Sequence, residues 1–119
     1  MAKILFVDDS RDSADTLDTF FKLLGHETAV AYDGECALET AASFPFDIAF
    51  IDLQMPMLDG FDTAKAIRAQ RGQAAILIAL TGQDWSKTRL EADIAGFDGY
   101  LQKPARASDL VAIVDALPH

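Results

Sequence analysis

Short apolar runs alternate along the chain with segments in which apolar residues recur at every third or fourth position. The runs at 3–7, 48–51 and 75–80 are almost continuously apolar, which is typical of parallel strands buried on both faces. The run at 28–31 is shorter and less apolar, so we expect it at an edge of the sheet. Residues 99–102 form a weaker fifth candidate. The pattern therefore predicts five strands.

One amphipathic segment follows each of these runs, and its apolar positions have the spacing of a helix. These positions are Ala14, Leu17, Phe21 and Leu24 in the first segment, Ala37, Leu38, Ala41 and Ala42 in the second, Phe61, Ala64 and Ile67 in the third, Leu90 and Ile94 in the fourth, and Leu110, Ile113, Val114 and Leu117 in the fifth. Asp59 and Asp84 can cap the third and fourth helices, and Ser108 or a neighbour opens the fifth. Gly25 and Gly96 can end the first and fourth helices.

Five strand–helix units in 119 residues predict one α/β domain over residues 1–119, built on a doubly wound, flavodoxin-like parallel sheet. Crossover connections are right-handed, and helices on both faces then favour the strand order 2-1-3-4-5. The chain contains no linker, repeat or low-complexity stretch. We therefore expect a single domain without an output domain.

Charge and composition narrow the classes of function. The 19 acidic residues outnumber the 10 basic ones, and the resulting formal net charge of −9 repels nucleic-acid phosphates. The longest strongly apolar run, 74–80, is too short to span a bilayer, and two aspartates interrupt the apolar start, so we expect neither a membrane helix nor a signal peptide. Cys36 is the single cysteine, which excludes an internal disulfide and a cysteine-based metal site, and we expect it to pack. These features predict a cytoplasmic protein that does not bind nucleic acid or membranes directly.

Polar side chains follow the apolar runs at the points where the predicted strands end. Asp8 and Asp9 follow the first run, Asp52 the third, Thr81 the fourth and Lys103 the fifth. In such sheets, ligands bind outside the carboxyl ends of the strands, where the strand order reverses. The reversal lies between the first and third strands, so the three carboxylates should converge there. The hydroxyl and the ammonium should approach them from one side.

Three carboxylates at one place repel one another unless a cation joins them. Oxygen ligands without a nearby histidine or thiol suit Mg²⁺, with Mn²⁺ as a substitute. A carboxylate beside Mg²⁺, a lysine and a hydroxyl can accept a phosphoryl group, because the cations offset the charge on the phosphoryl oxygens. The hydroxyl of Thr81 could donate a hydrogen bond to one of these oxygens.

Four segments carry these residues, with the sequences FVDDS at 6–10, IDLQMPMLDG at 51–60, ALTG at 79–82 and GYLQKP at 99–104. They resemble the receiver domain of two-component response regulators, a family to which the bacterial chemotaxis regulator belongs. The resemblance extends over almost the whole chain. It implies a phosphoprotein of a phosphorelay, a signalling domain that catalyses only its own phosphorylation and dephosphorylation.

The resemblance implies an acceptor and a metal site. Asp52 is the expected phosphoryl acceptor. Asp8 and Asp9 are the acidic pair that holds Mg²⁺, Asp9 directly and Asp8 mostly through water. Gln54 is expected to contribute its backbone carbonyl to the metal.

The resemblance also implies a switch. Thr81 matches the switch hydroxyl and Lys103 the phosphate-binding lysine. Tyr100 matches the aromatic residue whose rotamer follows the switch, and the peptide bond before Pro104 is expected to be cis.

Phosphorylation would change a surface that another protein reads. We expect that surface on the fourth helix, fifth strand and fifth helix, with Trp85, Arg89, Tyr100 and Arg106 as candidate contacts. The resemblance implies a sensor histidine kinase or a histidine phosphotransfer protein as the phosphoryl donor. It implies a monomer, or a dimer that forms on phosphorylation, in either a single-domain regulator or the receiver of a hybrid kinase or longer regulator.

Three other functions fit parts of the pattern. A Mg²⁺-dependent phosphohydrolase would need a second acid two residues after Asp52, where the chain has Gln54. A flavin carrier on the same fold would need a hydroxyl- and glycine-rich loop after the first strand, where Asp8 and Asp9 would repel a phosphate. A phosphate-independent adaptor would lack part of the set of acidic residues and lysine, and this chain has all of it.

Overall fold

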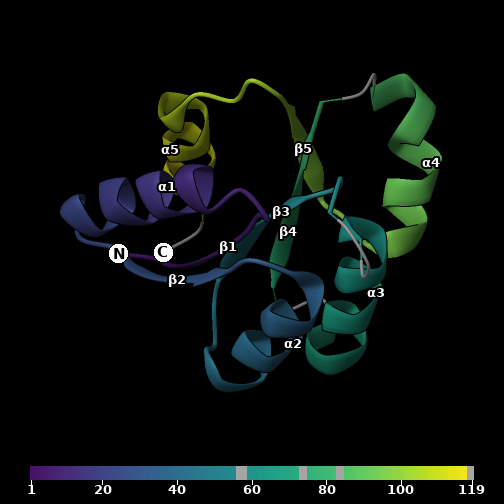
Figure 1. The fold of residues 1–119 in the computed structure, drawn as a ribbon, viewed down its shortest axis with the longest axis horizontal. Coiled ribbons are helices and arrows are strands. Elements are labelled where there is room, and N and C mark those ends of the chain that lie inside the picture. Colours follow the sequence, from purple (N-terminus) through teal and green to yellow (C-terminus); the bar gives the residue numbers. More distant parts are fainter. Residues whose placement is uncertain (56–58, 73–74, 83–84, 118–119) are drawn as a thin grey trace.

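The computed structural model describes residues 1–55, 59–72, 75–82 and 85–117, along which strands and helices alternate (Figure 1). The strands are β1 (Lys3–Val7), β2 (Glu27–Ala31), β3 (Ile48–Asp52), β4 (Ile76–Thr81) and β5 (Gly99–Gln102). The helices are α1 (Arg11–Leu23), α2 (Gly34–Ser43), α3 (Gly60–Arg71), α4 (Trp85–Ala95) and α5 (Ala107–Asp115). The five predicted strands are confirmed, although β3 and β4 each reach one residue further and end on Asp52 and Thr81.

The strands form one parallel sheet in the order β2-β1-β3-β4-β5, which confirms the predicted doubly wound fold. Strand β2, which is less apolar than the central strands, lies at an edge as expected, and the most apolar strands lie in the middle. Val7 is level with Ile51 across β1 and β3, and Asp52 is level with Leu80 across β3 and β4. The carboxyl ends of the three central strands therefore meet at one edge of the sheet.

The sheet lies between two helical layers, each with its own apolar core (Figure 1). Successive side chains of a strand point to opposite faces, so Leu5 and Val7 pack toward α2, α3 and α4. Ile4 and Phe6 of the same strand pack toward α1 and α5, together with Phe21. Burial on both faces is the reason why the central strands are continuously apolar.

Local signals set several of the helix ends. Asp59 caps α3 as predicted, with its side chain accepting a hydrogen bond from the Asp62 N–H at 2.9 Å. Gly25 and Gly96 follow α1 and α4 with φ of 93° and 98°, a left-handed conformation that glycine adopts without strain. Asp84, the predicted cap of α4, lies outside the described residues.

Helix α4 exposes the apolar pair that identifies it in the sequence. Leu90 and Ile94 are 73% and 68% exposed, whereas Ala92 and Ala95 are buried. Small alanine side chains let the helix lie close to its neighbours, and the larger pair is left on the solvent side. The apolar pair that marks this helix in the sequence therefore does not form its buried face.

Cys36 is exposed on α2, so the expectation that it packs is also wrong. The reason is that Ala37 and Ala41 form the buried face of this helix. A hydrogen bond to the Asp33 side chain raises the pKa of the Cys36 thiol. This contact disfavours the reactive thiolate.

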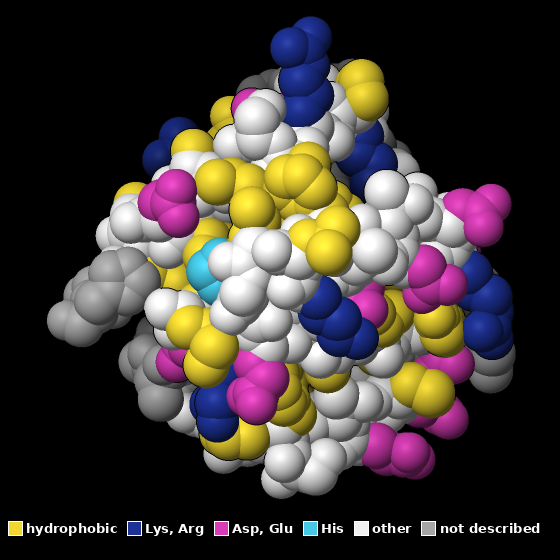
Figure 2. All heavy atoms as spheres, turned by 90° about the vertical axis from the view of Figure 1, so that its left-hand side faces the viewer, with side chains coloured by type: hydrophobic (Ala, Val, Ile, Leu, Met, Phe, Trp, Pro, Cys, Tyr) yellow, Lys and Arg dark blue, Asp and Glu magenta, His cyan; other side chains and the backbone are white. Residues whose placement is uncertain are grey.

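The end of the molecule that carries the amino terminus has an apolar surface. Figure 2 shows hydrophobic side chains gathered on this face. Met1, at the terminus, and Phe20, Leu23 and Leu24, at the end of α1, are exposed large hydrophobic residues. Among the described residues, no helix combines the length and apolar character needed to cross a bilayer.

Candidate functional site

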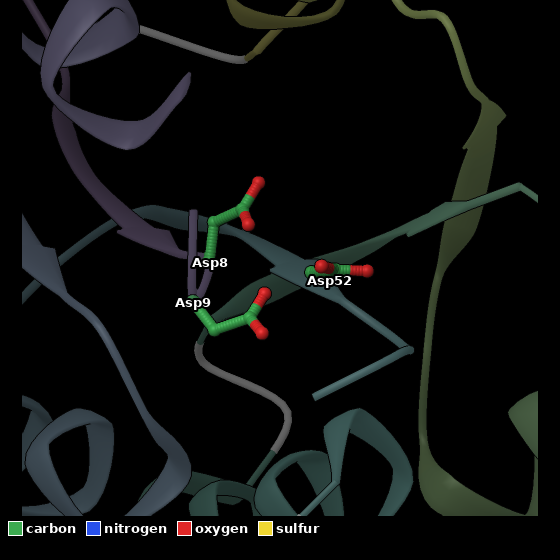
Figure 3. A group of neighbouring side chains, drawn as sticks. All are labelled: Asp8, Asp9 and Asp52. Carbon is green, nitrogen blue, oxygen red and sulfur yellow. The ribbon is translucent and has the colours of Figure 1, made fainter. Parts of the chain in front are cut away.

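Three carboxylates converge at the carboxyl edge of the sheet, where the strand order reverses (Figure 3). Asp8 and Asp9 follow β1, and Asp52 ends the adjacent strand β3. Each can offer one oxygen such that all three oxygens lie within 4.8 Å of one another. Asp8 and Asp52 are buried, whereas Asp9 is exposed and forms the solvent-facing side of the group.

Backbone hydrogen bonds hold the two buried carboxylates in place. The Ser10 N–H donates to Asp8 Oδ1 at 2.9 Å, and the Gln54 N–H donates to Asp52 Oδ1 at 3.0 Å. Each carboxylate thus accepts from the residue two positions on, in the first turn of the loop that leaves its strand. The strand backbone is fixed as well, since the Asp8 N–H donates to the carbonyl of Ala31 on β2.

Lys103 supplies a cation to this group. Its Nζ lies 3.1 Å from Asp52 Oδ2, and the lysine side chain is 35% exposed against 3% for the aspartate. Lys103 directly follows β5, and its N–H donates to the carbonyl of Thr81. The Lys103–Pro104 peptide bond is cis, the geometry that the resemblance implied.

The electrostatics of the site favour a cation. Burial raises the pKa of Asp8, and the negative charge of Asp52 raises it further. The hydrogen bond from Ser10 and the charge of Lys103 act in the opposite direction and only partly offset this. Two buried carboxylates and one lysine leave a net negative charge, before Asp9 is counted.

The donor set fits Mg²⁺. The ligand atoms are carboxylate oxygens, which hard divalent cations prefer. Asp9 is exposed, so solvent reaches the group, and Mg²⁺ usually keeps several of its waters. Pro104, Leu17, Leu80 and Leu110 line a cleft beside Asp8 and Lys103 on the α1–α5 side of the site.

The remaining predicted residues lie on neighbouring elements. Thr81 ends β4 beside β3 and is fully buried. Tyr100 pairs with Ala79 across β4 and β5 and is 42% exposed. Arg89 on α4 and Arg106, the N-cap of α5, are exposed. The side chain of Trp85 lies outside the described part of the structure.

The sequence pattern gives no role to two residues that contact the site. Ser10 binds Asp8 through its backbone N–H, which any residue type except proline provides, so no sequence signal identifies it. Gly60, the first residue of α3, lies against the backbone of Asp52 and Leu53. A glycine directly after a helix cap is the only signal that could have indicated this approach.

Comparisons with known proteins agree with this architecture. The chain matches the family model described as response regulator receiver domain over residues 4–115. It is 36% identical over 115 residues to the transcriptional regulatory protein PrrA of Mycobacterium bovis, which covers 97% of this chain and 49% of PrrA. The chain thus spans about half the length of the curated relatives that it matches.

Solved structures show the same fold. The chemotaxis protein CheY4 of Vibrio cholerae superposes with a TM-score of 0.91 at 31% identity, over 99% of both chains. The receiver domain of the sensor histidine kinase PA1611 from Pseudomonas aeruginosa PAO1 has a TM-score of 0.84 at 30% identity, over 96% of this chain and 94% of that chain. That receiver was solved with a magnesium ion coordinated in its active-site cleft. Fold, site and family match lead to one conclusion: this chain belongs to the response regulator receiver domains.

Proposed function

We propose that this chain accepts a phosphoryl group on Asp52 in a Mg²⁺-dependent reaction. The observation that carries the proposal is the meeting of three carboxylates with the Lys103 ammonium, 3.1 Å from Asp52. Asp8, Asp9 and Asp52, with the backbone carbonyl of Gln54, would hold the metal. When bound, Mg²⁺ would offset negative charge on the phosphoryl oxygens.

The residues of the chain then have distinct tasks. An oxygen of Asp52 attacks the phosphorus, and the bond between phosphorus and the donor's leaving group breaks as the acyl phosphate forms. Lys103 already lies beside this carboxylate and would bind a phosphoryl oxygen. The hydroxyl of Thr81, at the end of the adjacent strand, would donate a hydrogen bond to another.

The donor and the reader of the signal are proposed to be proteins. The similar receiver from Pseudomonas aeruginosa belongs to a sensor histidine kinase, and PrrA is a transcriptional regulatory protein. We infer a phosphohistidine of a kinase or phosphotransfer protein as the donor. We place the output on α4, β5 and α5, where Leu90, Ile94 and Tyr100 are exposed large hydrophobic side chains and where Arg89 and Arg106 are exposed as well.

A phosphorylation assay tests this function. The protein is incubated with acetyl phosphate and Mg²⁺, and the modified residue is trapped with borohydride and located by mass spectrometry. We expect one phosphoryl group on Asp52, none in the Asp52→Asn variant and none when EDTA removes the metal. The Asp47→Asn variant is the matched control, because Asp47 lies on β3's amino-terminal side and should leave labelling unchanged. Equal labelling of Asp52→Asn and the unaltered chain would overturn the proposal.

A further inference from the structure

The first residue of α3 approaches the acceptor strand more closely than any side chain would allow. A Cβ atom placed on Gly60 would overlap the carbonyl oxygen of Asp52 and would lie 2.6 Å from the Cα of Leu53. It would also lie 3.0 Å from the carbonyl carbon of Asp52. All three atoms belong to the backbone, which cannot rotate away as the end of a long side chain can.

Both sides of this contact are held firmly. The Leu53 N–H donates to the carbonyl of Leu80 at 3.0 Å, so the end of β3 is tied to β4. On the other side, Asp59 caps α3, and the buried Thr63 hydroxyl donates to the Asp59 carbonyl at 2.8 Å. Gly60 itself donates its N–H to the Leu53 carbonyl at 3.4 Å. A methyl group at Gly60 must therefore displace either the helix or the strand end.

Other glycines show that this constraint is specific. A Cβ on Gly82, which follows Thr81, would meet only the Gln54 side-chain oxygen, at an ordinary 3.5 Å. A Cβ on Gly96 would meet the side chain of Arg68, far along the chain from the acidic group. Among the glycines for which the structure gives these contacts, Gly60 alone would press on the backbone of a residue in the acidic group.

The peptide against Gly60 carries the chemistry of the site. The Asp52 side chain is attached at this peptide. Both oxygens of its carboxylate have partners, the Gln54 N–H at 3.0 Å and Lys103 Nζ at 3.1 Å. Gln54, one residue further, is the proposed carbonyl ligand. Mg²⁺ demands near-ideal octahedral geometry, so a shift of this peptide of a few tenths of an ångström would move proposed ligands out of place.

We propose that Gly60 is a positioning residue for the acceptor. Its missing side chain lets the amino-terminal turn of α3 hold the Asp52–Leu53 peptide where the three carboxylates and Lys103 converge. Gly60 touches neither the metal nor the phosphoryl group and acts only through this peptide. The inference rests on the proposed function of the site.

The test compares Gly60→Ala with Ile67→Val. Ile67 is fully buried on the same helix, seven residues after Gly60, so its shortening loosens the core without adding an atom to the first turn of α3. The dissociation constant for Mg²⁺ is measured by titration of amide chemical shifts, and the phosphorylation rate is measured with acetyl phosphate. We expect Gly60→Ala to weaken Mg²⁺ binding and to slow phosphorylation by about tenfold or more, and Ile67→Val to change only the melting temperature. A Gly60→Ala protein with wild-type affinity and rate would overturn the inference.

A second pair of variants decides the matter if Gly60→Ala fails to fold. Asp59→Ala keeps the glycine but removes the hydrogen bond that closes the first turn of α3, whereas Asp59→Asn keeps a capping side chain and removes the charge. We expect weaker Mg²⁺ binding in Asp59→Ala than in Asp59→Asn, and equal affinities would overturn the inference. If the unaltered chain neither bound Mg²⁺ nor became phosphorylated, the proposed function would fail instead.

Discussion

Lys103 reaches across β4 to Asp52, so that its ammonium lies 3.1 Å from a carboxylate oxygen. The elements α3, β4, α4 and β5 separate the two residues in sequence, and the parallel sheet brings the ends of β3 and β5 to one edge. The contact places a positive charge beside a buried negative one. Among the described residues, it is the only ion pair that involves a carboxylate of the acidic group.

The first prediction concerns this pair. Removal of the ammonium in Lys103→Met leaves the Asp52 charge without its partner and should destabilise the metal-free domain by about 1 kcal/mol, since the lysine is partly exposed. A double-mutant cycle with Asp52→Asn, measured by urea denaturation, isolates the coupling. We expect much of the loss to disappear in the Asp52→Asn background. Effects that simply add would show that the pair contributes no stability.

The second prediction concerns pH. Because the pKa of Asp8 is raised in the folded chain, the folded state binds more protons than the unfolded state between the ordinary value of 3.8 and the raised value. The contribution of Asp8 to stability therefore grows as the pH falls through this window, and it is lost as the pH rises above it.

Asp8→Asn should accordingly be more stable than the unaltered chain at neutral pH without metal, by about 1 kcal/mol. The advantage should shrink at mildly acidic pH and should reverse at saturating Mg²⁺, which stabilises only the chain with the complete site. Urea denaturation in EDTA and in Mg²⁺ measures this. A variant less stable at neutral pH in EDTA would contradict the conclusion that folding disfavours the charged form of Asp8.

The third prediction concerns the metal ligand that faces solvent. Asp9→Asn should weaken Mg²⁺ binding by about tenfold or more and slow phosphorylation, because it removes the negative charge of one of the three carboxylates. The thermal stabilisation by a fixed concentration of Mg²⁺ should fall accordingly. Asp12→Asn, an exposed change on α1, is the control for net charge. Equal stabilisation of all three proteins would exclude Asp9 as a ligand.

The fourth prediction concerns the route from the acceptor to the surface. Thr81→Ala should leave Asp52 open to phosphorylation but should uncouple it from α4, β5 and α5. The reason is that this variant lacks the hydroxyl that would donate a hydrogen bond to the phosphoryl group. Thr81→Ser, which keeps the hydroxyl, should respond as the unaltered chain does. Amide chemical shifts on addition of beryllofluoride report the response. Identical shifts in Thr81→Ala and Thr81→Ser would refute this route.

The fifth prediction concerns Arg68 on α3, which binds the loop after the carboxyl end of α4. The Arg68 guanidinium donates to the carbonyls of Gly96 at 2.8 Å, Gly72 at 2.9 Å and Ala75, and it pairs with Asp98. Loss of these bonds in Arg68→Met leaves several carbonyls without a donor and should destabilise the domain by about 3 kcal/mol. Lys65→Met, an exposed change on the same helix, should stay within about 0.5 kcal/mol. Similar melting temperatures of the two variants would show that water replaces the guanidinium.

The sequence pattern was sufficient for the elements, the sheet order and the composition of the site. Strands buried on both faces must be continuously apolar, and the handedness of crossovers leaves few orders for five such strands. Asp8, Asp9, Asp52 and Lys103 could be expected together because strand ends are visible in the sequence. Carboxyl ends of parallel strands share one edge, so local signals were enough to place these residues there.

The tertiary structure decided the distances and the exposed faces. The pattern of α4 could not show that Ala92 and Ala95, rather than Leu90 and Ile94, face inward, because helical periodicity marks a stripe without saying what packs on it. Likewise, a glycine after a helix cap was the only sign that Gly60 would touch the Asp52 peptide, and no signal around Arg68 showed that its side chain would donate to three carbonyls. Such contacts join residues distant in sequence, and they depend on the twist of the sheet and the approach of each helix. Those quantities result from the packing of the whole chain, so no local stretch of sequence encodes them.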